Sequence, residues 1–309
     1  MLFFSSHCKS RKMQRIRGLV LRTGFLISSR SYSQNSPNAL ATLRRKTGYT
    51  ISNCKKALDL HQNNLVAAEK WLNDQAQALG WSKAEKLEGR KTQQGLIGVL
   101  VRDNCGVMLE VNCETDFVAR NKKFQEFLGA SSATCWKYIR ENVKNATDVS
   151  QKNLSSDDLK ALLAADGKIL SDHLALLIGT VGENAALRRG IGFKSEDSGV
   201  FLTGYAHPSQ TEEDGFSFGK FGAVVAFRRS DTPRDPQLER KICQHIVGMN
   251  PKRIGDKAVD EANEDADSED VLIHQEFIAD ATKTVGEILE ESHLEVVNFT
   301  RFECGEGSE

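Results

Sequence analysis

The sequence lacks the short motifs that mark nucleotide-binding and hydrolytic enzymes. It has no G-x-x-x-x-G-K-[ST] phosphate-binding loop: the stretch from Gly215 to Lys220 comes nearest, but its spacing fails and Phe221 follows the lysine. It also has no H-E-x-x-H, no G-x-S-x-G, and no G-x-G-x-x-G between a strand and a helix. We therefore predict no catalytic residues, no cofactor and no direct nucleotide binding, and hence a protein that is not an enzyme.

Long apolar runs and paired cysteine motifs are missing as well. No stretch approaches the roughly 20 apolar residues that span a bilayer, and 39% apolar with 27% charged residues is typical of a soluble globular protein. The seven cysteines include no Cys-x-x-Cys, and the seven scattered histidines add no metal-ligand spacing. We expect reduced, mostly buried thiols, no metal site and no membrane association.

Acidic residues are missing from the N-terminal part of the chain, where the first one is Asp59. Residues 1–38 carry seven Lys or Arg and eight Ser, interrupted by apolar residues. This composition predicts a mitochondrial transit peptide over residues 1–32. The alternative, a basic arm that binds nucleic acid, gives the apolar residues no role. We therefore expect the protein in the mitochondrial matrix, a reducing compartment that suits free thiols.

The charge of the remaining chain points to a protein partner. Without the seven positive charges of the N-terminus, the net charge falls from −1 to −8. A protein this acidic is poorly suited to the phosphate backbone, so we expect no nucleic-acid binding. The acidic, mostly polar segment 256–270 predicts a surface loop.

Residues 39–80 have the pattern of three short helices. Gly48 ends the first, Ser52 can cap the second, and the third ends near Gly80. Three short helices in about forty residues resemble a ubiquitin-associated fold. Residues 81–94 are highly charged without an apolar stripe, which predicts a linker.

Two similar pairs of strands follow the linker. They span 95–101 with 107–111 and 199–205 with 221–227, and a loop from His207 to Phe218 joins the second pair. Each pair opens with Gly and an apolar run and is flanked by helical sequence, which indicates a diverged duplication. We predict an α+β fold: the ubiquitin-associated-like module, then two related lobes with antiparallel sheets, over residues 95–195 and 196–309.

The segment from Glu110 to Asn121 predicts a strand that ends and a helix that begins. Apolar and polar residues first alternate with the period of a half-buried strand, and Phe117, Asn121, Phe124 and Leu128 then recur at three to four residues, the period of a helix. Thr115 or Asp116 can cap the helix, because a side-chain oxygen accepts the unpaired amide protons of its first turn. Phe117 is then either a core aromatic or part of a site.

This segment and others, taken in order, are similar to the elongation factor Ts family, the guanine-nucleotide exchange factors of elongation factor Tu. The further matches are Leu43–Gly48 with Cys54–Leu58, Gly182–Arg189 and Val296–Gly307. The resemblance covers about residues 40–307. It implies that the chain binds mitochondrial elongation factor Tu·GDP and promotes GDP release during translation elongation. The three-helix module alone suggests an alternative, a ubiquitin-binding adaptor.

The resemblance also implies which residues contact elongation factor Tu. Asp116 and Phe117 would act on nucleotide release, with Phe117 as a wedge near the Mg²⁺ site of the partner. Arg44 and Lys55 would dock the N-terminal module on the nucleotide domain. His207 would contact the partner from the second lobe, although the proline that follows it departs from the family pattern.

Overall fold

The computed structural model describes residues 37–49, 51–87, 89–144, 148–211, 215–229 and 233–307. The predicted transit peptide, residues 1–32, lies outside the described residues. The N-terminal module consists of α1 (Pro37–Thr47), α2 (Ile51–Leu60) and α3 (Leu65–Leu87). Its buried core includes Leu43, Cys54, Ala57, Leu58, Ala68 and Leu72. The three predicted helices are therefore present, each burying one apolar stripe.

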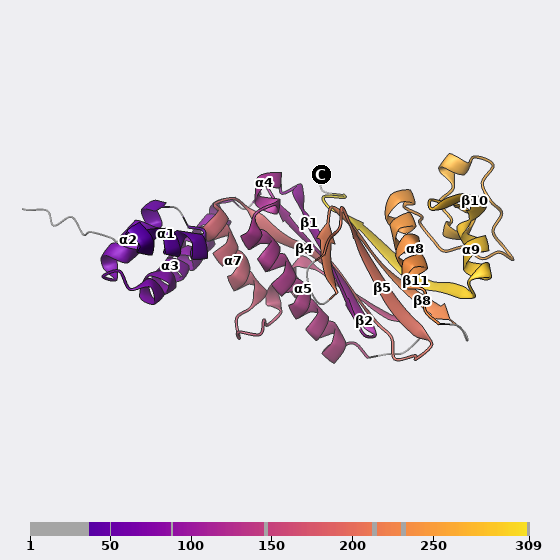
Figure 1. The fold of residues 1–309 in the computed structure, drawn as a ribbon, viewed down its shortest axis with the longest axis horizontal. Coiled ribbons are helices and arrows are strands. Elements are labelled where there is room, and N and C mark those ends of the chain that lie inside the picture. The colour runs from indigo at the N-terminus through magenta and orange to yellow at the C-terminus, as the bar shows by residue number, and fades with distance from the viewer. Residues whose placement is uncertain are drawn as a thin grey trace, which may run out of the picture. The chain divides into compact units, whose positions relative to one another are not determined.

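A six-stranded antiparallel sheet forms the first lobe, in the order β3-β4-β2-β1-β7-β6. Its strands are β1 (Gln94–Arg102), β2 (Cys105–Cys113), β3 (Ser150–Leu154), β4 (Ala185–Lys194), β6 (Gln210–Thr211) and β7 (Phe216–Gly219). The helices are α4 (Asp116–Ala119), α5 (Lys122–Asn142), α6 (Ser156–Ala161) and α7 (Leu170–Val181). α5 and α7 cover one face of this sheet (Figure 1), where they bury an apolar cluster with β1, β2 and β4.

The second lobe is built on a three-stranded antiparallel sheet, in the order β11-β8-β5. Its strands are β5 (Val200–His207), β8 (Phe221–Arg229) and β11 (Leu294–Glu303). The other elements are α8 (Pro236–Met249), η1 (Ala266–Ser268), η2 (Leu272–His274), β9 (Glu276–Phe277), β10 (Asp280–Thr284) and α9 (Val285–Glu291). α8 packs on the face of this sheet that lies away from the first lobe (Figure 1). The acidic segment 256–270 is mostly exposed, as predicted.

The two sheets pack face to face and share an apolar layer. Ile97 and Val99 of β1 meet Leu202 of β5 and Val224 of β8 in this layer. Period-two alternation places the other side chains of β1 against α5, so each sheet is buried on both faces. The α+β class with antiparallel sheets is confirmed. Among the described residues, no helix is long and apolar enough to cross a membrane.

Glu110 of β2 is fully buried between the sheets, although the alternation predicted a half-buried strand. Its carboxylate accepts hydrogen bonds from Arg189 at 2.6 Å, from Arg188 at 3.3 Å and from the backbone N–H of Gly305 at 2.7 Å. A buried carboxylate needs such partners, because desolvation penalises an unpaired charge. The half-buried prediction was wrong because the second sheet and the C-terminal segment cover the polar side of β2.

α3 is longer than predicted because Gly80 packs against a neighbouring helix and does not end its own. A Cβ atom at Gly80 would lie 1.7 Å from the carbonyl oxygen of Ala175, and one at Gly179 would lie 2.0 Å from that of Ala76. Only glycine lets the backbones of α3 and α7 approach this closely. The predicted helix end was therefore wrong, and α3 continues into the predicted linker 81–94.

The predicted loop from His207 to Phe218 instead contains two short strands. Phe218 and Phe216 of β7 pair with β1, at Gly98 and Leu100. Both phenylalanines are buried against the first lobe. The alternation of Phe216 and Phe218 with polar neighbours is the period-two signal of a strand. A segment of the second lobe thus extends the sheet of the first.

Candidate functional site

The turn between β2 and α4 presents the residues predicted to act on nucleotide release. Thr115 is the N-cap of α4, and its hydroxyl oxygen accepts a hydrogen bond from Val118 N at 3.4 Å. Asn121 then caps a second helix, α5. The single helix that the sequence predicted is therefore two helices, because each start has its own side-chain cap.

Phe117 is exposed, with 80% of its surface open to solvent. Phe124 of α5, by contrast, is fully buried against the first sheet. The break between α4 and α5 explains the difference, because it removes Phe117 from the apolar face of α5. The interpretation of Phe117 as a core residue was therefore wrong. Its contact with a partner stays a prediction, and an exposed aromatic on an ordered helix suits one.

Asp116 lies beside Phe117 and is half-exposed. Its carboxylate forms an ion pair with Arg120 at 2.9 Å, and the arginine side chain is largely exposed. An exposed pair of this kind contributes little to stability. Both Asp116 and Arg120 are thus free to exchange this contact for one with a partner. The structure places an acid and an aromatic side by side, as the sequence predicted.

His207 is exposed at the end of β5, and its ring nitrogen Nδ1 lies 3.0 Å from the hydroxyl of Tyr205. The backbone carbonyl of His207 accepts a hydrogen bond from Lys220 N at 2.7 Å, and Lys220 Nζ donates to the carbonyl of Gly95 at 3.0 Å. Gly95 lies at the start of β1, opposite the end of β2. His207 and α4 therefore lie at the same end of the two sheets.

Arg44 and Lys55 lie on the N-terminal module and not at this end of the sheets. Arg44 is on α1 and Lys55 on α2, and both are exposed. Their neighbours Leu43 and Cys54 point into the core of the module, which fixes the orientation of the two basic side chains. The structure thus presents the five predicted residues on two surfaces: the sheet end and the helical module.

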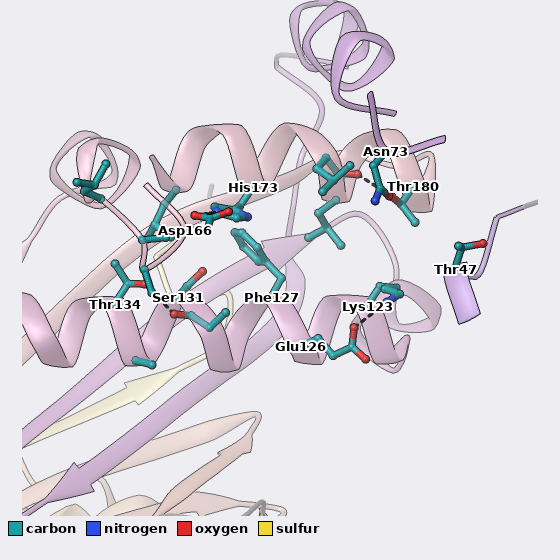
Figure 2. Close-up of a pocket in the computed structure, with 18 of the residues that line it drawn as sticks. Thr47, Asn73, Lys123, Glu126, Phe127, Ser131, Thr134, Asp166, His173 and Thr180 are labelled. Atoms are coloured by element: carbon teal, nitrogen blue, oxygen red, sulfur yellow. Dashed lines mark hydrogen bonds and ion pairs between the residues drawn. The ribbon is translucent and has the colours of Figure 1, made fainter. Parts of the chain in front are cut away.

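A groove that the sequence did not predict lies between the N-terminal module, α5 and α7. It has a volume of about 660 Å³ and is lined mainly by apolar atoms, including those of the Phe127 side chain. Figure 2 shows Phe127 pointing from α5 toward α7, which carries His173, 3.1 Å from Asp166. None of the five predicted site residues lines it. Its walls come from segments far apart in the chain, so no local sequence pattern reveals it.

The thiols of the described residues are not poised for chemistry. The six cysteines there are free, and all but Cys304 are fully buried. Burial raises the pKa of Cys105, Cys113 and Cys135 to about 12 and that of Cys304 to about 11. A thiol with so high a pKa is not a nucleophile near neutral pH. Within the described residues, no group of three His, Cys, Asp or Glu side chains could hold a metal ion.

Comparison with known proteins gives the same family for both parts of the chain. A family model described as "Elongation factor Ts, mitochondrial, N-terminal" matches residues 23–82, and one described as "Elongation factor TS" matches residues 114–268. Among curated proteins, "Elongation factor Ts, mitochondrial" of Aedes aegypti is 53% identical, covering 90% of this chain and 91% of the relative. The proteins of the same name from Drosophila melanogaster and Homo sapiens are 49% and 39% identical, covering 88% and 90% of this chain and 86% of each relative.

Proposed function

Since the chain belongs to the elongation factor Ts family of translation elongation factors, we propose that it is a guanine-nucleotide exchange factor. Its partner is mitochondrial elongation factor Tu, and its task is to promote GDP release during translation elongation. The mitochondrial relatives and the Arg- and Ser-rich N-terminus support a location in the mitochondrial matrix. In this proposal the chain itself neither binds nucleotide nor catalyses a covalent step.

Exchange follows from a coupling of two binding equilibria. A protein that binds nucleotide-free elongation factor Tu more tightly than Tu·GDP must weaken GDP binding by the same factor. To do so, it must contact the elements of the partner that hold Mg²⁺ and the phosphates. We assign this contact to Phe117 and Asp116, with Phe117 inserting between helices of the partner and Asp116 competing for the polar groups around Mg²⁺.

The exposure of Phe117 is the observation that carries this assignment. An isolated Phe with 80% of its surface in water gains little from its own fold, but it can bury that surface in a pocket of a partner. Phe has two rotatable side-chain bonds, so ordering it on binding costs little entropy. The short helix α4 holds its backbone in place through the Thr115 cap.

Arg44, Lys55 and His207 supply affinity in this proposal. Their side chains are exposed, and the two basic residues sit on the N-terminal module, away from α4. Contacts on separate surfaces let the chain remain bound while Phe117 acts on the nucleotide site. Binding free energy at these contacts offsets the free energy needed to open that site.

The direct test measures release of fluorescent GDP from mitochondrial elongation factor Tu with and without the chain. We expect release to accelerate in proportion to the chain concentration and then to saturate. Unchanged release at saturating chain would refute the exchange function. A parallel pull-down from mitochondrial matrix separates this proposal from the alternative: capture of ubiquitin in place of elongation factor Tu would favour the adaptor.

A further inference from the structure

Three segments of the chain meet at the base of α4. The first is the end of α3, the long helix of the N-terminal module. The second is the turn between α7 and β4, which holds Glu183 and Asn184. The third is the turn between β2 and α4, which holds Glu114 and Thr115. We refer to these four residues as the α4 junction.

Asn184 bonds to both of the other segments. Its side-chain amide donates to the carbonyl oxygens of Leu87 at 3.2 Å and Arg90 at 3.4 Å, at the end of α3. Its backbone N–H donates to Glu114 Oε1 at 2.8 Å. The second carboxylate oxygen of Glu114 lies 3.4 Å from the Arg90 guanidinium. Asn184 therefore ties the end of α3 to the turn that begins α4, and the Arg90–Glu114 pair links the same two segments directly.

Thr115 makes the second link of the junction. Its hydroxyl donates to Glu183 Oε2 at 2.8 Å and at the same time accepts from Val118 N in the first turn of α4. A hydroxyl that uses both its donor and its acceptor has one allowed orientation. The cap of α4 is thus oriented by the turn that follows α7, and not by α4 alone.

The turn that holds Glu183 and Asn184 is itself fixed to the N-terminal module. Gly182 follows α7 as its C-cap, and its positive φ of 85° turns the chain directly into Glu183. One turn earlier, the backbone at Gly179 lies in close contact with Ala76 of α3. At these glycine contacts no side chain separates the two helices, so we expect a displacement of α3 to carry α7 with it. A displacement of α3 therefore reaches the base of α4 through both Asn184 and α7.

We propose that the α4 junction positions Phe117 relative to the N-terminal module. Docking of the module on elongation factor Tu then fixes the position of α4. Part of the binding free energy at the N-terminal module is thereby used to insert Phe117 into the partner at the sheet end. The junction residues are positioning residues, since they act through α4 and touch no nucleotide. This inference rests on the proposed exchange function, and it concerns residues to which the family resemblance assigned no contact with the partner.

The test separates the rate of nucleotide release from affinity. Glu114→Ala removes the acceptor of Asn184 N, whereas Glu114→Gln keeps an oxygen that can accept it. We expect Glu114→Ala to slow GDP release at saturating chain by about tenfold, the effect of one hydrogen bond to a charged group, while Kd for the partner changes by less than about threefold. Glu114→Gln should restore most of the rate.

A second pair of variants probes the link to α3. Asn184→Ala removes the bonds to Leu87 and Arg90 but keeps the backbone bond to Glu114. Asn142→Ala is a matched control, because its side-chain amide donates to the backbone carbonyl of Tyr138 at 3.0 Å, on the exposed end of α5. We expect slower release for Asn184→Ala and unchanged release for Asn142→Ala, with closely similar melting temperatures. Hydrogen exchange of the α4 amides should accelerate in Asn184→Ala without any partner present.

Combination with Phe117→Ala decides whether the junction acts through the aromatic. If it does, Glu114→Ala adds little to the loss already caused by Phe117→Ala, because the two changes affect one step. Additive losses, or rate and affinity falling in parallel, would overturn the positioning role. Unchanged α4 hydrogen exchange would do so as well. If the unmodified chain fails to accelerate GDP release, the exchange function itself is refuted, and the junction proposal with it.

Discussion

Replacing Phe117 with alanine separates partner binding from folding, because most of its side chain touches no other part of the chain. Only about a fifth of the Phe117 surface is covered within the chain. A fully buried Phe→Ala change costs roughly 3–5 kcal/mol, so a fifth of this cost is at most about 1 kcal/mol. For a chain of this size, we expect the melting temperature to fall by less than about 4 °C.

The same exposed surface gives the expected loss of exchange. A buried Phe covers at least about 150 Å², so covering the exposed 80% of Phe117 on a partner removes about 120 Å² or more from water. At about 25 cal/mol per Å² this is worth roughly 3 kcal/mol, within the range of about 2–4 kcal/mol for an interface hot spot. GDP release should therefore slow by about 30- to 1000-fold if the whole contact serves that step.

Phe124 supplies a matched control seven residues along the chain. It is fully buried, so Phe124→Ala should lower stability by roughly 3–5 kcal/mol, while exchange per folded molecule stays normal. Melting temperature and fluorescent-GDP release are measured on both variants. Phe117 does not act on nucleotide release if Phe117→Ala shows a large shift in melting temperature with normal exchange per folded molecule, or if the two variants behave alike.

Three further predictions concern targeting, nucleotide binding and pH. A chain that begins at residue 33 should fold and bind elongation factor Tu in vitro but remain in the cytosol of cells, as fractionation would show; matrix import of this chain would disprove the transit peptide. The purified protein should show no heat of GDP or GTP binding by calorimetry, and micromolar affinity in protein free of elongation factor Tu would contradict this. Burial lowers the pKa of His245, whose Nε2 lies 2.9 Å from Gln275 Oε1 and whose Nδ1 accepts from Ile278 N at 3.2 Å. The fold therefore favours the neutral ring. The stability that His245 contributes is complete above the pKa of about 6.5 that the ring has in the unfolded chain, and it is lost as the pH falls toward the lower pKa that the ring has in the fold. As the pH is lowered below about 6.5, the melting temperature should fall more steeply for the unmodified chain than for His245→Gln.

Local sequence signals predicted the elements whose ends are fixed by nearby residues. Thr115 was one of two predicted caps, and the structure confirms it through its bond to Val118 N. The pair Asn250–Pro251 predicts a helix end, and Asn250 ends α8 in a left-handed conformation. Caps and left-handed residues act within about four positions, so a short window of sequence contains the interaction that they make.

Two of the wrong predictions share a different cause, contact with residues remote in the sequence. The alternation of β2 predicts a half-buried strand, yet Arg189 and Gly305 bond to the carboxylate of Glu110 from 79 and 195 positions away. Gly80 predicts a helix end, since no sequence pattern shows that Ala175 lies against it. Periodicity shows which side chains share a face, but not what packs against that face.

Phe117 shows why an exposed aromatic can remain ordered in this fold. The two residues that follow it, Val118 and Ala119, are buried in the first lobe, and Thr115 before it is held by two hydrogen bonds. Its backbone is therefore fixed from both sides before any partner arrives, and the entropy of ordering it is already lost on folding. When a partner binds, the apolar surface of Phe117 is buried, and the only conformational entropy lost by this residue is that of its side chain. The buried neighbours of Phe117 stabilise the chain, and the exposed ring is left available for binding.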